Sequence, residues 1–150
     1  MKHKADIVID ADRATVWQLF DDPDNLKKWQ PTLKSFTHRS GVQGHPDAVS
    51  ELVFDERGRD VPMTLTITAR REQAFLGGTY ESAWGTVVVF NLFEDFGHEK
   101  TRWVVNSNYR FRGLMKIMAL FTRAAILRRV DDDLHRFKLL VESATARELS

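Results

Sequence analysis

The chain has 150 residues with 22 basic and 21 acidic side chains, and its formal net charge of +1 gives no reason to expect a nucleic-acid partner. Cysteine is absent, which excludes disulfides, thiolate nucleophiles and cysteine-ligated zinc. A chain of this length most simply forms one domain with its own hydrophobic core, so we expect a single domain over residues 1–150.

The N-terminal residues carry no targeting pattern. Residues 1–6 lack the apolar centre of a signal peptide. No apolar run in the chain reaches the ~18 residues that a membrane-spanning helix needs. We therefore expect a soluble, cytoplasmic protein without stable membrane insertion.

A strand and two short helices are predicted next. Residues 4–10 alternate apolar and polar side chains as a strand does. Asp12 suits the N-cap of a short helix, which ends at Pro23. Residues 24–25 can cap a second short helical turn, which Pro31 closes.

Residues 33–111 read as strands and turns. We expect strands over residues 33–39, 49–54, 61–70, 79–84, 86–94 and 101–111, separated by segments rich in glycine, aspartate and proline. In the third of these strands, Met63, Leu65 and Ile67 share one face, and threonines occupy the other. A strand with one apolar and one polar face is half buried, so the predicted antiparallel sheet has one dry and one wet side.

The expected strand 101–111 places several large side chains on one face: Trp103, Val105, Ser107, Tyr109 and Phe111. On the strand 79–84, Tyr80 and Ser82 share a face with Trp84 if that strand has no bulge. Residues 86–94 are apolar on both faces and therefore do not fix the register of the sheet.

The last predicted element is a long helix over residues 114–144. Its apolar residues recur at steps of three and four and form one stripe that must face the sheet: Leu120, Ala124, Leu127, Val130, Leu134, Phe137, Val141 and Ala144. Residues 114–127 are apolar nearly all round, so a second face also needs a partner. The two short helices could pack there; alternatively, this face covers a pocket, contacts a second subunit in a homodimer or touches a membrane surface.

Three segments carry a family resemblance. Residues 10–23, with Leu26, Trp29 and Pro31, are followed at a distance by residues 100–103 and 133–142. Together they resemble the START-like or SRPBCC superfamily, in particular its polyketide cyclase/dehydrase and lipid-transport branch. The resemblance implies an α+β helix-grip fold, in which a curved, seven-stranded antiparallel sheet holds the long C-terminal helix with a cavity between them. It does not select one function, because the superfamily contains lipid carriers, hormone receptors, aromatic cyclases, quinone-binding proteins and chaperone co-factors.

A cavity of this kind would destabilise the fold if it were empty. An empty void of ~300 Å³ would cost about 7 kcal/mol, which rivals the total stability of a domain. It must therefore contain water or a ligand, or be filled by side chains. We predict that a hydrophobic ligand would contact Phe54, Met63, Leu65, Ile67, Tyr80, Ser82, Trp84, Phe90, Trp103, Val105, Ser107, Tyr109, Leu120, Ala124 and Leu127. Plain core packing is the alternative for each of the aromatic residues.

Catalytic and metal-binding patterns are weak. The 5 histidines show no paired metal-ligand spacing, and no Gly-x-Ser-x-Gly nucleophile motif is present. Asp131 and His135 lie one helical turn apart, but residues 131–133 are most simply a solvated acidic segment among arginines. We therefore name no catalytic residue, and we expect neither a metal nor a cofactor.

The sequence thus favours a module that binds a hydrophobic or amphipathic small molecule, such as a lipid or a polyketide, between the sheet and the long helix. One alternative is an enzyme of the aromatic cyclase or dehydratase type, which a buried acid or base would favour. The other is a protein-interaction or chaperone-assisting module that uses the apolar residues 114–127.

Overall fold

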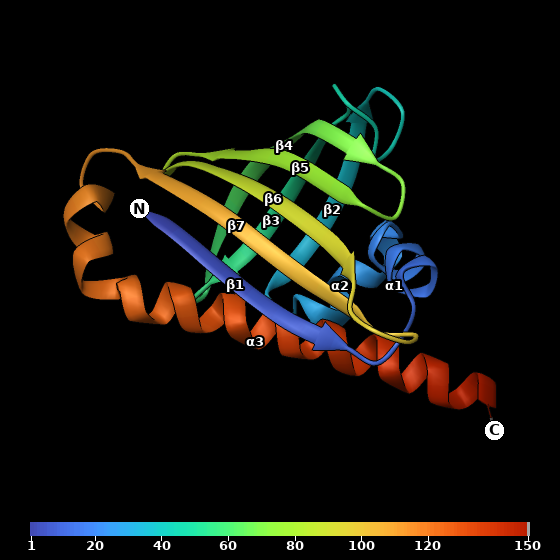
Figure 1. Cartoon of the computed structure of the whole chain (residues 1–150). Helices are drawn as coiled ribbons and strands as arrows, with labels where there is room; N and C mark the ends of the chain where they lie inside the picture. The colour runs from blue at the N-terminus through green and yellow to red at the C-terminus, as the bar shows by residue number, and fades with distance from the viewer. Residues whose placement is uncertain (150) are drawn as a thin grey trace.

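A computed structural model describes residues 1–149, and over this range it contains one sheet of seven strands, two short helices with a 3-10 turn between them, and one long helix (Figure 1). The elements are β1 (Lys2–Ile9), α1 (Arg13–Phe20), η1 (Pro23–Asn25), α2 (Leu26–Trp29), β2 (Leu33–Ser40), β3 (Val49–Glu56), β4 (Arg59–Arg71), β5 (Phe75–Ser82), β6 (Gly85–Asp95), β7 (Thr101–Phe111) and α3 (Met115–Leu149). Their order confirms the predicted α+β helix-grip fold.

The sheet is antiparallel throughout. Its strand order is β1-β7-β6-β5-β4-β3-β2, so β2 to β7 form a meander and β1 joins its far edge by pairing with β7. Figure 1 shows the sheet curving around α3, with α1 and α2 at one end. The predicted face of β7 is confirmed, because Trp103, Val105 and Ser107 are all buried on the side toward α3.

The helix caps near the N-terminus are partly as predicted. The carboxylate of Asp12 accepts a hydrogen bond of 2.8 Å from the backbone N–H of Thr15, and this confirms the first cap. The second cap is Asp22, whose carboxylate accepts from the N–H of Asp24 at 2.9 Å. Asn25 occupies the predicted N-cap position of α2, but its side chain makes no capping bond there, because it is buried and its amide donates to the carbonyl of Leu19.

Strand β5 begins earlier than predicted and ends before Trp84. Gly77 and Gly78, which precede the predicted strand 79–84, pair with Phe90 and Val89 inside the sheet. A Cβ atom on Gly77 would lie 2.9 Å from the ring of Phe90, and one on Gly78 would lie 2.9 Å from Leu65. These glycines are therefore explained by close packing of neighbouring side chains.

The main core lies where α1, α2 and the second half of α3 meet the sheet. Phe20 is at the centre of an aromatic cluster, with ring centroids 5.7 Å from Trp103 and 5.8 Å from Phe137. Trp29 closes the same cluster, 5.3 Å from Phe137. Trp103 and Phe137 are almost completely buried, so these rings anchor α3 to the sheet.

The predicted stripe on α3 is correct only in the second half of the helix. Leu134, Phe137 and Val141 are buried as expected, but Leu120 is 78% exposed and Ala124 is also exposed. Figure 1 shows the reason: the first turns of α3 run at a steep angle to the rest of the helix, so a different set of positions faces the sheet there. Ala119 is buried in their place.

Candidate functional site

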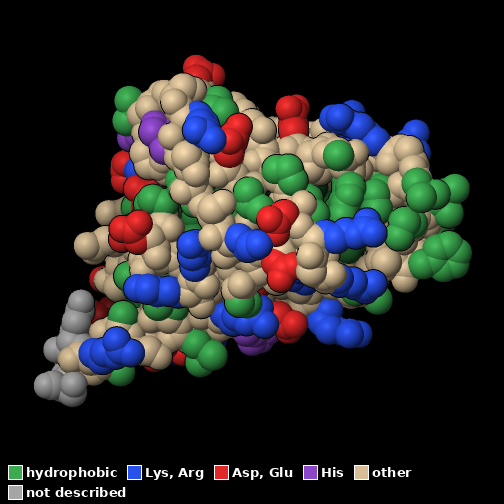
Figure 2. Space-filling model, turned by 180° about the vertical axis from the view of Figure 1, so that it is seen from behind, with side chains coloured by type: hydrophobic (Ala, Val, Ile, Leu, Met, Phe, Trp, Pro, Cys, Tyr) green, Lys and Arg blue, Asp and Glu red, His purple; other side chains and the backbone are tan. Residues whose placement is uncertain are grey.

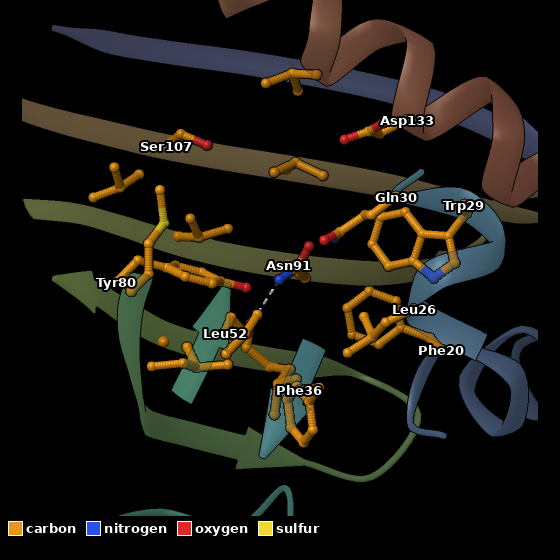
Figure 3. A pocket seen from close by; sticks show the side chains of 18 of the residues that line it. Phe20, Leu26, Trp29, Gln30, Phe36, Leu52, Tyr80, Asn91, Ser107 and Asp133 are labelled. Carbon is orange, nitrogen blue, oxygen red and sulfur yellow. Dashed lines mark hydrogen bonds between the residues drawn. The ribbon is translucent and has the colours of Figure 1, made fainter. Parts of the chain in front are cut away.

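Two adjoining cavities lie between the sheet and α3. The first has a volume of about 310 Å³ and extends from α1 and α2 along the inner face of the sheet (Figure 3). The second, of about 580 Å³, lies toward the start of α3. Met63, Tyr80, Tyr109, Ile126 and Arg129 line both, so the two cavities meet at these side chains.

The structure brings most of the predicted ligand contacts to these cavities. The first cavity is lined by Phe54, Met63, Leu65, Ile67, Tyr80, Trp103, Val105, Ser107 and Tyr109. The second is lined by Ser82 and Trp84, together with Met63, Tyr80 and Tyr109. These residues come from β3, β4, β5 and β7 and the turn after β5, and the alternation of each strand explains why they share the concave face.

Four predicted contacts line neither cavity: Phe90, Leu120, Ala124 and Leu127. Phe90 lies on the outer face of β6, where its ring stacks on Phe75 at 5.2 Å and covers Gly77. The sequence could not place it, because β6 is apolar on both faces. The three α3 residues are misplaced because the first half of the helix turns a different face toward the sheet.

An amide and an indole form a polar pair in the wall of the first cavity. The Nε1–H of Trp103 donates to the Oδ1 of Asn91 at 3.1 Å, and the Asn91 Nδ2 donates to the carbonyl of Leu76 at 3.2 Å. Asn91 faces the cavity (Figure 3), because it lies two positions from Val89 and therefore shares the inner face of β6 with it. Sequence reasoning missed it, although it is the one amide within an otherwise apolar strand core.

Asp133 points from α3 into the first cavity, opposite the sheet (Figure 3). Its side chain is 18% exposed, and its Oδ1 accepts from the Nη1 of Arg136 at 2.9 Å. Burial raises the pKa of Asp133 to about 6, and the nearby charges of Arg129 and Arg136 oppose this rise. The prediction of a solvated acidic segment is therefore wrong for this residue. The available signal was its place between Val130 and Leu134 on the buried side of the helix.

Hydroxyl groups add further polar surface to the cavities. Burial raises the pKa of Tyr80 to about 12, so its phenol stays protonated at neutral pH and can donate a hydrogen bond. Burial also raises the pKa of Tyr109, and a hydrogen bond with Ser107 partly offsets this. The side chain of Tyr80 is half-buried, and it lines both cavities.

Arg129 stands where the two cavities meet. Its guanidinium donates to the carboxylate of Glu56 and to the hydroxyl of Thr32, and it lies 5.5 Å from the ring centroid of Phe54. These contacts tie α3 to β3 across the cavity wall. This arginine is paired with Glu56 and belongs to the lining of both cavities.

A second arginine, Arg70, holds two residues of the cavity lining, Asp21 and Gly44. Arg70 is only 7% exposed, and its Nη1 and Nη2 donate to the two oxygens of Asp21, each at 2.7 Å. Its Nη1 also donates to the carbonyl of Gly44 at 3.0 Å, and its guanidinium lies 5.1 Å from the ring centroid of Trp17. These bonds raise the pKa of Arg70 and join β4 to α1 and to the loop after β2.

Among the residues that the structure describes, no group of three or more histidine, aspartate or glutamate side chains is placed to hold a metal ion. None of the helices there combines the length and apolar character that crossing a bilayer requires.

Solved structures with the same architecture come from several bacteria. A Thermus thermophilus protein has a TM-score of 0.80 at 18% identity, covering 96% of this chain and 99% of its own. The Zhui aromatase/cyclase from Streptomyces sp. R1128 has a TM-score of 0.81 at 14% identity, covering 95% of this chain and 93% of its own. A START superfamily protein from Mycobacterium smegmatis has a TM-score of 0.75 at 13% identity, covering 95% and 98%. Identities this low establish a shared fold and nothing finer.

The sequence comparisons give the family. No curated protein matches the chain. Residues 2–142, however, match the family described as polyketide cyclase/dehydrase and lipid transport. This match runs through every strand and most of α3, and the helix-grip architecture agrees with it. The chain therefore belongs to the polyketide cyclase/dehydrase and lipid transport family of the SRPBCC superfamily.

Proposed function

We propose that this protein binds a hydrophobic or amphipathic small molecule, of the lipid or polyketide type, in the first cavity. The observation that carries the proposal is the largely apolar cavity of about 310 Å³ between the sheet and α3, which polar side chains enter from both the sheet and the helix. Gln30, Asn91 and Ser107 face into it and can orient a carbonyl or hydroxyl group of the ligand (Figure 3).

Energetics support an occupied cavity. At about 24 cal/mol per Å³, a dry void of this size would cost about 7 kcal/mol, against a typical total stability of about 5 to 15 kcal/mol. Water relieves that cost poorly where the walls are apolar, since each molecule needs two or more polar partners. An apolar ligand with one or two polar groups matches the wall better.

The test is binding of cis-parinaric acid, a fluorescent fatty acid, to the purified protein and two variants. Ser107→Phe fills the cavity from β7, whereas Asn106→Phe places the same ring on the exposed outer face of that strand. We expect Ser107→Phe to weaken binding about tenfold or more and Asn106→Phe to leave it unchanged. Circular dichroism checks the fold of both variants. Equal binding by all three proteins, or no binding by the wild type, would refute the proposal.

A second candidate function is catalysis of the cyclase or dehydratase type, and Asp133 favours it. A carboxyl group with a pKa of about 6 inside an apolar cavity can give a proton to a carbonyl oxygen and take one from the adjacent carbon near neutral pH. The Zhui aromatase/cyclase has the same fold. The test is turnover of a linear poly-β-ketone: Asp133→Asn should abolish it and still bind cis-parinaric acid. Turnover that survives in this variant would remove Asp133 from the chemistry.

A further inference from the structure

The start of α3 exposes more apolar surface than the rest of the helix. Leu114, just before it, is 71% exposed, Ile117 57% and Met118 46%. One turn later, Leu120 is 78% exposed and Phe121 84%. We call these five residues the α3 apolar patch. Figure 2 shows hydrophobic side chains gathered at this end of the molecule, at the right of the view.

The segment of the chain that carries the α3 apolar patch is basic. The sequence contains no aspartate or glutamate between Lys100 and Val130. Five basic residues from this stretch make no ion pair with a carboxylate among the described residues: Arg110, Arg112, Lys116, Arg123 and Arg128. The chain as a whole is nearly neutral, so this end carries a local excess of positive charge.

The patch also borders the second cavity. Met115, Met118, Thr122 and Ala125 line that cavity from the first turns of α3. Met118 belongs to both the patch and the cavity wall. A surface that covers the patch therefore lies directly beside the larger of the two cavities.

We propose that the α3 apolar patch docks on an anionic membrane surface, with the apolar side chains among the acyl chains and the basic side chains at the lipid headgroups. Apolar residues beside lysine and arginine are the composition of helices that lie in the membrane interface. Each basic side chain near an anionic surface strengthens binding by about fivefold. This docking goes beyond the proposed function and does not require a ligand in either cavity.

The charge around the α3 apolar patch favours a membrane over a second copy of the chain as its partner. A two-fold dimer through this patch would bring each basic set against its symmetry mate. Neither copy supplies a carboxylate from residues 101–130 to compensate. An anionic lipid surface supplies that compensation, so it fits the patch better. The experiment below also detects the homodimer that the sequence allowed as an alternative.

The test is co-sedimentation of the full chain with vesicles of phosphatidylcholine containing about one third phosphatidylserine. We expect the wild type to bind, and to bind more than about twentyfold more weakly to phosphatidylcholine alone or in about 0.5 M salt, where screening is strong. The double variant Leu120→Ser/Phe121→Ser should lose binding about tenfold or more. Leu139→Ser, which alters an exposed leucine farther along α3, should bind like the wild type.

A second variant tests the charges. Lys116→Gln/Arg123→Gln should weaken binding to the phosphatidylserine vesicles by about twentyfold and change binding to phosphatidylcholine little. All substituted side chains are exposed, so the fold should survive, and circular dichroism checks this. A wild type that binds no vesicle, or binding that the double serine variant leaves intact, overturns the proposal. Gel filtration that shows a dimer abolished by the serine variant overturns it in favour of a second copy.

Discussion

At the scale of single residues, Asp133 has the most unusual environment in the cavity. Its pKa of about 6 lies above the ordinary value of 3.8, so the native state holds its proton more tightly than the unfolded chain does. Between pH 3.8 and about 6 the native state therefore binds more protons than the unfolded state. The free energy of unfolding falls as the pH rises through this range, because the buried carboxyl group must lose its proton. The same burial that costs stability at neutral pH places a titratable group next to any bound ligand.

Asp133→Asn removes this titration. Relative to the wild type, the variant should gain about 2 kcal/mol of unfolding free energy between pH 4 and pH 7.5, since it no longer has to bury a charge. Urea denaturation at several pH values measures this difference. Asp131→Asn, at an exposed position on the same turn of α3, is the control and should follow the wild type. Parallel pH profiles for Asp133→Asn and wild type would contradict the predicted burial.

Arg70 shows the opposite case of a buried charge that is fully paired. Arg70→Met would leave Asp21 partly buried without its cation and should destabilise the protein by about 3 kcal/mol. Arg39→Met breaks a similar two-bond contact with Glu51, but that pair is more than half exposed and should matter by less than about 1 kcal/mol. Urea denaturation of both variants gives the comparison. If both variants lost the same unfolding free energy, burial would not explain how much the Arg70–Asp21 pair contributes to stability.

At the scale of elements, α3 consists of two parts with different tasks. Its second half packs on the aromatic cluster through Phe137, which is completely buried, whereas its first half is largely exposed. Figure 1 shows that these two parts also differ in direction. The stability of the helix should therefore come from its second half, and its first half should tolerate substitution.

Alanine substitutions on α3 test this division. Phe137→Ala removes a ring that contacts Phe20, Trp29 and Trp103, and should cost about 3 to 5 kcal/mol of unfolding free energy. Leu139→Ala, only two positions away but 64% exposed, should change it by less than about 0.5 kcal/mol. Both changes introduce the best helix former, so helix propensity does not explain the difference. Thermal or urea denaturation measures it; similar costs at both sites would contradict the packing described for α3.

At the scale of the whole molecule, stability and binding are linked through the cavities. A ligand that binds only the folded protein should stabilise it by about 2.7 kcal/mol at a concentration of one hundred times its Kd. We expect cis-parinaric acid to raise the unfolding free energy of the wild type and of Asn106→Phe by this amount. Because Ser107→Phe should bind at least about tenfold more weakly, its unfolding free energy should rise by about 1.4 kcal/mol or less at the same concentration. An equal rise in all three proteins would place the probe outside the first cavity.

The sequence by itself determined the order of elements, the half-buried strands and the long helix. Period-two alternation around Met63 and along residues 101–111 is a local property, so it needs no knowledge of distant parts of the chain. The Asp12 cap and the buried positions Leu134, Phe137 and Val141 were predictable for the same reason. The family resemblance added the curvature of the sheet and the cavity that the seven strands enclose with α3.

Only the tertiary structure decided which side chains meet in the cavity. The inward face of β6, and with it Asn91, depends on pairing with β5 and β7, because an apolar strand has no preferred face of its own. The outward position of Leu120 depends on the change of direction in α3. The raised pKa of Asp133 and the pairing of Arg129 with Glu56 come from neighbours far away in sequence. Burial and electrostatics are properties of the assembled interior, and a local pattern does not contain them.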